Sequence, residues 1–154
     1  MTPLILPRLP SAPGHARRYL GPRFRAMGFS QDKVEEMLVA VGEAVTNAVV
    51  HGAPDGETAE MDAVTVHLVV RNSDITVAVT SPRTGWRLSP RLRGDLMAER
   101  GRGLLMIQSL TDAWRVRQGA GGTTVYLTWR LPSGPRKDVL RSPLGRDHRR
   151  RRAS

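Results

Sequence analysis

The chain has 154 residues, a formal net charge of +10 and no cysteine. This length suits one domain with a buried core, and the lack of cysteine excludes disulfides and thiolate metal sites. No apolar run approaches the roughly 20 residues that a membrane-spanning helix needs, and the proline-rich first ten residues contain too short an apolar run for a signal peptide, so we expect a cytoplasmic protein.

The first helical pattern covers about residues 13 to 27. Gly21-Pro22 should kink or shorten this helix, because proline has no N–H to donate to the preceding turn. Gly28 then has the place of a helix-ending glycine. The apolar residues that recur at helical spacing are Ala16, Tyr19, Leu20, Phe24 and Met27.

A second helix should begin after Ser30, a good N-cap residue, and continue to about His51, where Gly52-Ala53-Pro54 ends it. One broad face of this helix is apolar and should pack on the core. It consists of Val34, Met37, Leu38, Val41, Val45, Ala48 and Val49.

The opposite side of the same helix carries a line of polar residues at four-residue spacing, Glu43, Asn47 and His51, in the segment GEAVTNAVVHG. Residues four apart leave a helix on the same side. Ala40 and Ala44 border the line with small side chains, so we expect another part of the structure or a ligand to come close to it.

Residues 63–70, 74–80 and 123–130 are rich in β-branched residues and partly alternating, which predicts strands, and 114–118 can form a fourth. Hairpin turns are expected at 71–74 and 119–122. Residues 100–112, between the segments 74–80 and 114–118, predict a short amphipathic helix that begins at glycines. The fold class is therefore α+β, a two-layer α/β sandwich with a mostly antiparallel sheet covered by helices on one face.

From residue 132 onward the composition changes. The segment 132–154 holds eight Lys and Arg against two Asp, a net charge of +6, and has no apolar periodicity. We therefore divide the chain into a domain, 1–131, and a basic C-terminal tail, 132–154, without a packed core. The tail is either a solubilising extension or a segment that contacts RNA, DNA or acidic surfaces without sequence specificity.

Three motifs occur in a fixed order along the domain: VGEAVTNAVVHG at 41–52, ERGRGLLMIQSLTDAW at 99–114 and GGTTVYLTW at 121–129. They resemble the N box, the glycine box and the closing strand of the GHKL or histidine kinase-like ATPase domain, whose fold is a Bergerat-type sandwich. The resemblance covers residues 8–131. Within that family it is to the small single-domain branch that holds the anti-sigma factor serine/threonine kinases of Gram-positive bacteria, common in actinomycetes.

The resemblance implies that the chain binds ATP and Mg²⁺ and that each motif has a role in this. Glu43 would be the general base that polarises the attacking hydroxyl, and Asn47 would hold Mg²⁺ through its amide oxygen, an adequate ligand for a hard cation. Thr124 matches the threonine that lines the adenine pocket. His51 caps the helix or touches the site.

The glycine box would hold the phosphates. Glycines at the start of a helix let backbone N–H groups approach a phosphate, and the helix dipole assists. Arg100 and Arg102 could pair with phosphate or equally with a partner protein. The residues of this box that the resemblance assigns to the nucleotide are Gly101, Arg102, Gly103 and Leu104.

One position departs from the family pattern. The family carries an aspartate after the second strand that accepts a hydrogen bond from the adenine amino group, and here the matching residue is Ser81. A neutral acceptor is weaker than a carboxylate. The free energy of ATP binding should therefore become less favourable by about 1–3 kcal/mol. Gly85 stands where the family has the glycine of the same box.

Three functions remain open on these grounds. The first is an active kinase that phosphorylates a serine or threonine of an antagonist (anti-anti-sigma, STAS-type) protein and binds a sigma factor, which the intact Glu43 and Asn47 favour. The second is a degenerate module that acts by protein binding, which Ser81 favours. The third is a nucleic-acid-associated protein that uses the basic tail. We expect no membrane partner, and a homodimer is left open.

Overall fold

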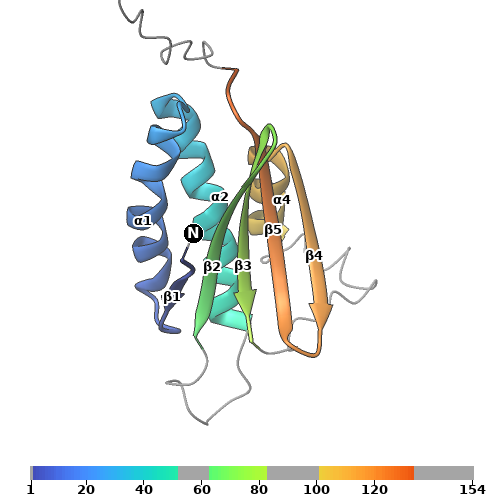
Figure 1. Cartoon of the computed structure of the whole chain (residues 1–154). Helices are drawn as coiled ribbons and strands as arrows, with labels where there is room; N and C mark the ends of the chain where they lie inside the picture. The colour runs from blue at the N-terminus through green and yellow to red at the C-terminus, as the bar shows by residue number, and fades with distance from the viewer. Residues whose placement is uncertain (1, 52–62, 83–100, 134–154) are drawn as a thin grey trace, which may run out of the picture.

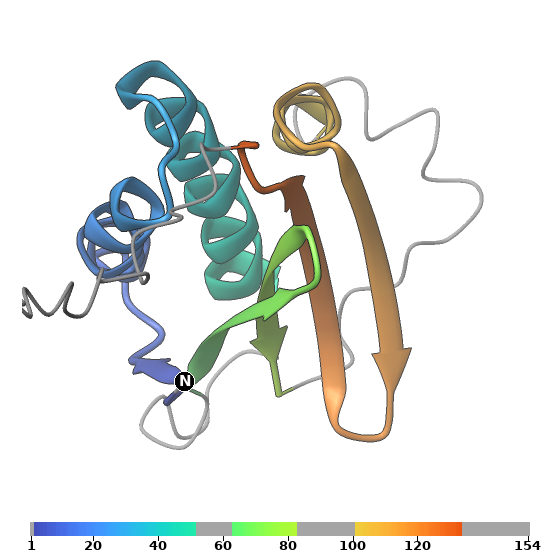
Figure 2. The ribbon, with the colours of Figure 1, turned by 45° about the horizontal axis from the view of Figure 1, so that its top comes forward.

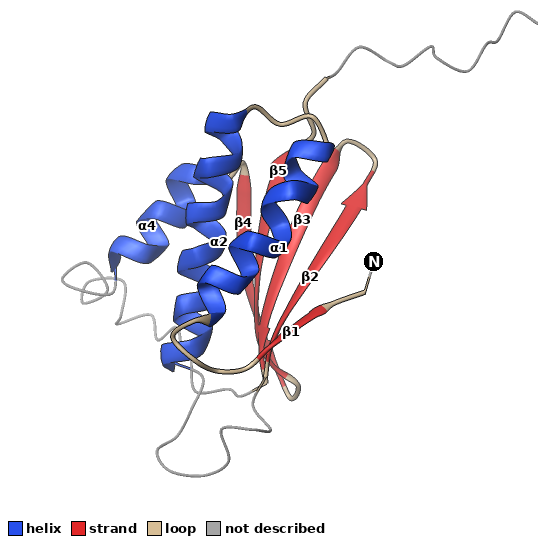
Figure 3. Ribbon diagram, turned by 90° about the vertical axis from the view of Figure 1, so that its left-hand side faces the viewer, coloured by secondary structure: helices blue, strands red, loops and turns tan. Residues whose placement is uncertain are grey.

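Three helices cover one face of a five-stranded sheet in the part of the chain that the computed structural model describes, residues 2–51, 63–82 and 101–133 (Figure 1, Figure 3). The strand order is β1-β2-β3-β5-β4, and every neighbouring pair is antiparallel. No helix in these residues is long and apolar enough to cross a membrane. The elements are β1 (Leu4–Leu6), α1 (Ala12–Ala26), α2 (Gln31–His51), β2 (Val64–Arg71), β3 (Asp74–Ser81), α4 (Gly101–Leu110), β4 (Ala113–Gly119) and β5 (Gly122–Arg130).

This architecture confirms the predicted α+β two-layer sandwich, including the short helix α4 between β3 and β4. Strand β1 is the one described element that the sequence analysis missed. It is only three residues long and lies between Pro3 and Pro7. It pairs with the start of β2, with Leu6 opposite Val64, and Leu6 is its one buried residue.

Helix α1 runs without interruption through Gly21 and Pro22, so the expected shortening is wrong. Pro22 is exposed, and water can satisfy the carbonyl that proline leaves without a donor. Gly21 is buried against α2, and a Cβ built there would lie 3.4 Å from Leu38 Cδ1. The glycine therefore serves close helix packing, which stabilises α1 despite the proline.

The predicted end of α1, the predicted N-cap of α2 and the predicted turn between β2 and β3 are confirmed. Gly28 follows α1 with a φ of +90°, the left-handed conformation that favours glycine. The Ser30 hydroxyl oxygen accepts a hydrogen bond of 3.2 Å from the backbone N–H of Lys33 and so caps α2. Asn72, at φ +53°, makes the tight turn between β2 and β3.

The core fills the space between the helix layer and the inner face of the sheet. Alternate residues of each central strand point inward, since side chains alternate along a strand. Trp129 is the largest fully buried side chain. Its ring centroid lies 6.0 Å from that of Phe24 on α1, and its Nε1–H donates a 2.7 Å hydrogen bond to the carbonyl of Leu110 at the end of α4. One residue of β5 thus ties two helices to the sheet.

We expect Trp129→Phe to lower the free energy of unfolding by about 2–3 kcal/mol, because it removes buried volume and leaves the Leu110 carbonyl without its donor. Urea unfolding measures this change. Trp114→Phe is the matched control, since Trp114 lies on β4 and is only partly buried. Equal losses in the two variants would contradict the role given to Trp129.

Candidate functional site

Glu43 and Asn47 lie together on the side of α2 that faces α4. Gly103, in the first turn of α4, lies directly against both residues. A Cβ built on Gly103 would be 2.9 Å from Glu43 Oε2, 3.7 Å from Asn47 Nδ2 and 3.8 Å from Asn47 Oδ1. Both side chains are partly buried. The structure therefore brings the first two motifs of the sequence into contact.

The residues that border the polar line are small and buried. Ala40 and Ala44 are fully buried, although they lie outside the apolar face that the sequence pattern defines. The expectation that the polar line faces something that comes close is confirmed, and within the described residues α4 is what approaches it. A Cβ at Gly103 would crowd the end of the Glu43 side chain, which would have to move.

The start of α4 is chemically suited to anions. The first backbone N–H groups of a helix have no partner within the helix, and the helix dipole is positive at this end. Here that end lies beside the carboxylate of Glu43 and the amide of Asn47. Leu104 packs against the core, so its backbone is the part that can face a ligand. Gly101 is the first residue of α4.

Ser81, the last residue of β3, lies on the helix-facing side of the sheet and is buried, with 5% of its surface exposed. Thr123 of β5 lies directly opposite it across the two strands and is 4% exposed. Neither side-chain oxygen has a hydrogen-bond partner in the described part of the chain. A buried hydroxyl without a partner costs about 1–3 kcal/mol, so these two atoms are suited to receiving a ligand.

Thr124 does not share this position. It lies on the opposite face of the sheet, where its hydroxyl oxygen is 2.9 Å from that of Thr80. The sequence-based assignment of Thr124 to the same pocket as Ser81 therefore does not match the geometry, because neighbouring strand residues point to opposite faces. Thr123, which shares the helix-facing side with Ser81, is a candidate site residue that the sequence analysis did not single out. The alternation of buried and less buried residues along β5 is the pattern that puts Thr123 on the inner face of the sheet.

Some predicted site residues, or their side chains, lie outside the described residues. Gly85 and Arg100 lie outside the described residues, as does the C-terminal tail that follows residue 133. His51 is the last residue of α2 and Arg102 the second of α4, but their side chains lie outside the described set. Their expected roles stay predictions.

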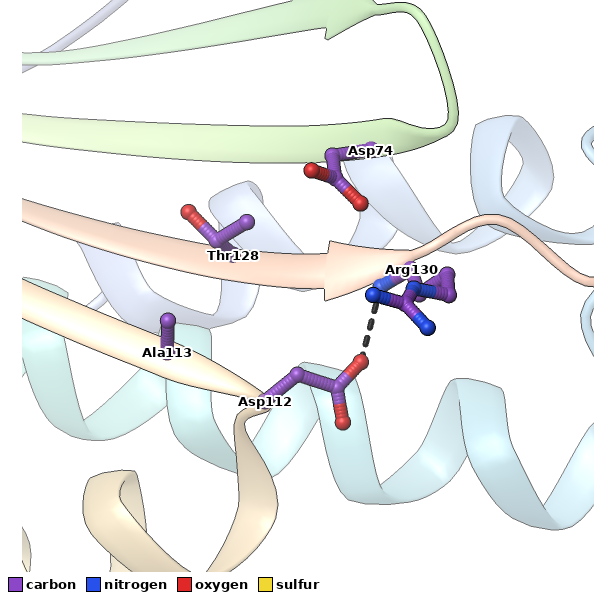
Figure 4. A pocket seen from close by; sticks show the side chains of 5 residues that line it. All are labelled: Asp74, Asp112, Ala113, Thr128 and Arg130. Carbon is purple, nitrogen blue, oxygen red and sulfur yellow. Dashed lines mark hydrogen bonds between the residues drawn. The ribbon is translucent and has the colours of Figure 1, made fainter.

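A shallow hollow of about 510 Å³ lies at the other end of β3 (Figure 4). Its floor includes Thr128, whose hydroxyl lies on the open face of the sheet, 3.0 Å from that of Thr76. Asp112 accepts a 2.7 Å hydrogen bond from the backbone N–H of Arg130 there. This carboxylate thus joins the beginning of β4 to the end of β5, and the hollow is separate from the α2–α4 contact.

Comparison with known proteins identifies the family. Residues 6–129 match the model of the histidine kinase-like ATPase domain. The chain is 30% identical to the serine-protein kinase RsbW of Oceanobacillus iheyensis over 124 residues, which cover 75% of this chain and 78% of that protein. It is 29% identical to RsbW of Bacillus subtilis over 143 residues, 86% of each chain.

A solved structure is also similar. It contains the RsbU and RsbW domains of a Mycobacterium tuberculosis protein, and the match has a TM-score of 0.59 and 26% identity over 85% of this chain. The chain spans about a third of that longer protein, since the match covers 33% of it.

The chain belongs to the histidine kinase-like ATPase family, whose members bind ATP. Within it, the RsbW relatives assign the chain to the anti-sigma factor serine kinases, as the three motifs indicated.

We expect Gly103→Ala to lower ATP affinity by about tenfold or more while the protein stays folded. Alanine favours a helix over glycine by up to about 1 kcal/mol, so thermal stability should hold. The new Cβ, however, would lie 2.9 Å from Glu43 Oε2 and must displace that side chain. Calorimetric titration with Mg²⁺ and ATP, together with a thermal melt, measures both effects.

Gly121→Ala is the matched control for this variant. A Cβ at Gly121 would meet nothing within 4 Å, and the residue has no positive φ. Unchanged ATP affinity in Gly103→Ala would show that the contact with Glu43 and Asn47 is unrelated to the nucleotide.

Proposed function

We propose that this protein is an ATP-dependent serine/threonine kinase of the anti-sigma type, which transfers the γ-phosphate of ATP to a hydroxyl of an antagonist protein. The observation that carries the proposal is the contact of Gly103 with Glu43 and Asn47. It puts a carboxylate, an amide oxygen and the N-terminal turn of a helix in one place. Phosphoryl transfer needs chiefly positioning and charge stabilisation, and these three groups supply both.

Each residue has a distinct part in the proposed reaction. The carboxylate of Glu43 accepts the proton of the attacking hydroxyl, a task that contributes roughly 10²–10⁴-fold to a rate. Asn47 would hold Mg²⁺ through its amide oxygen; when bound, the metal would supply charge neutralisation, and ATP would supply the phosphoryl group and leave as ADP. The backbone N–H groups at 101–103 hold the phosphates. Gly103 leaves space for this because it has no side chain.

The protein substrate and binding partners form the finer part of the proposal. The relatives are named serine-protein kinases, which supports a serine or threonine hydroxyl as the acceptor. We infer that the antagonist is an anti-anti-sigma protein of the STAS type and that the same chain binds a sigma factor. The basic segment 132–154 adds only non-specific electrostatic attraction for acidic surfaces or nucleic acid.

One observation favours a second function, a module that binds its partner with little or no catalysis. Ser81 is neutral where the family pattern has a carboxylate, which weakens the recognition of adenine. On this second proposal, Glu43 and Asn47 belong to a helix contact without chemistry. The two proposals differ in whether the wild-type protein transfers phosphate at all.

Glu43→Gln and Asn47→Ala should separate the two roles. Glu43→Gln keeps the shape and hydrogen bonding of the side chain but lacks a base, so transfer should fall by about 10²–10⁴-fold with nearly unchanged ATP binding. Asn47→Ala removes the protein ligand of the metal, so Mg²⁺-dependent ATP binding should weaken as well. The measurements are ATP titration and transfer of label from γ-labelled ATP to purified STAS-type proteins.

Thermal melts of both variants serve as the control, because both side chains lie off the core face of α2 and their loss should leave the protein folded. Transfer by wild type that persists in Glu43→Gln would refute the mechanism. No transfer by any of the three proteins, with partner binding retained, would favour the binding module.

A further inference from the structure

Two buried hydroxyls face each other at one end of the sheet and have no partner. Ser81 ends β3, Thr123 lies in β5, and the two residues are in register. They are 5% and 4% exposed, and neither oxygen has a hydrogen-bond partner within the described ranges. In the part of the chain that the structure describes, these are the two buried side-chain polar atoms without a partner.

The same two strands show that such pairs can satisfy themselves. On the open face, Thr80 and Thr124 are also in register, and their hydroxyl oxygens lie 2.9 Å apart. Thr76 and Thr128 repeat the arrangement at 3.0 Å. The inward pair of Ser81 and Thr123 differs because its hydroxyls do not bond to each other. Both hydroxyls are therefore available to a third group on the helix-facing side.

The backbone around this pair is closely packed. Gly122, next to Thr123, has a φ of +117°. A Cβ built on it would lie 2.8 Å from the carbonyl carbon of Pro82 and closer still to the carbonyl oxygen of Ser81. Only glycine allows β5 to begin this near the end of β3. This close packing fixes the positions of the two hydroxyls relative to each other.

The pair lies at the end of the sandwich toward which α2 runs. β3 ends, β5 starts and α2 ends at the same end of the sandwich (Figure 1, Figure 2). Asn47 lies in the last part of α2. On the proposed function, a nucleotide whose phosphates lie near Asn47 and Gly103 can extend its base toward this end of the sheet.

We propose that Ser81 and Thr123 together form a base-recognition site that accepts 6-aminopurines and 6-oxopurines alike, so that this protein binds both ATP and GTP. This inference rests on the proposed function. Adenine presents a donor at its 6-amino group and an acceptor at N1, whereas guanine presents an acceptor at O6 and a donor at N1. Each hydroxyl can donate or accept by rotating, so the pair complements either pattern.

A carboxylate at position 81 would behave differently. It only accepts hydrogen bonds when ionised, so it pairs with an amino group and repels the carbonyl oxygen of guanine. A site built to hydrogen-bond one group rejects an analogue that lacks it. The replacement of a carboxylate by Ser81, opposite Thr123, thus removes selectivity for adenine as well as some affinity.

The test is calorimetric titration of the full-length protein with ATP and with GTP in the presence of Mg²⁺. For wild type we expect the two dissociation constants to agree within about fivefold, a small difference on the scale of hydrogen-bond discrimination. Ser81→Asp should bind ATP more tightly than wild type does and prefer ATP over GTP by about tenfold or more. Thr123→Val should weaken both nucleotides.

Thr76→Val is the control for Thr123→Val. It makes the same replacement in the neighbouring strand, on the open face of the sheet, and should leave both affinities unchanged. A melting curve for each variant separates loss of binding from loss of folding.

Each remaining outcome decides a specific point. Wild type that prefers ATP by tenfold or more would overturn the inference and leave the proposed function intact. Equal effects of Thr76→Val and Thr123→Val would remove Thr123 from the site and overturn the inference too. Binding by Ser81→Asp alone would show that the hydroxyl pair does not hold a base. Failure of wild type and Ser81→Asp to bind either nucleotide would overturn the proposed function as well.

Discussion

The candidate site depends on how closely α4 approaches α2. Gly103 lies so near Glu43 that a single methyl group would come within 2.9 Å of its carboxylate oxygen. On α4 that approach needs glycine, since any Cβ at this position would crowd Glu43. It brings the N-terminal end of α4, with its unpaired N–H groups and positive dipole, next to a carboxylate and an amide. The packing and the chemistry therefore have the same cause.

Helix α1 approaches the other side of α2 by the same means. Gly42, adjacent to Glu43, lies beneath the guanidinium of Arg17, and a Cβ there would be 2.7 Å from Arg17 Nη1. Gly21 of α1 meets Leu38 in the same interface. Helix α2 is thus held between two helices and the sheet, with glycines at its closest contacts. A close-packed interior transmits small displacements, so the position of Glu43 is fixed by packing from several directions.

Elements with a clear hydrophobic period were predictable from the sequence. The face of the sheet to which a strand residue points, and features that depend on helix packing, were not. The β-branched alternation of 74–80 and the apolar stripe of α2 gave β3 and α2 nearly to the residue. The three residues of β1 are too few to show a period. Pro22 suggested a break that helix packing overrode. In the closing strand, a shift of one residue exchanges the two faces of the sheet, so the motif alone does not tell whether Thr123 or Thr124 shares a face with Ser81.

The predicted site divides into two parts on different structural elements. The part near the phosphates depends on α2 and α4, through Glu43, Asn47 and Gly103. The part near the base depends on the ends of β3 and β5, through Ser81 and Thr123. Residues without shared contacts contribute nearly independently to binding and stability. On the proposed function, the serine at position 81 would therefore affect which base is accepted and how tightly it binds. It would not affect whether Glu43 can remove a proton, so it favours the binding module only through weaker recognition of the nucleotide.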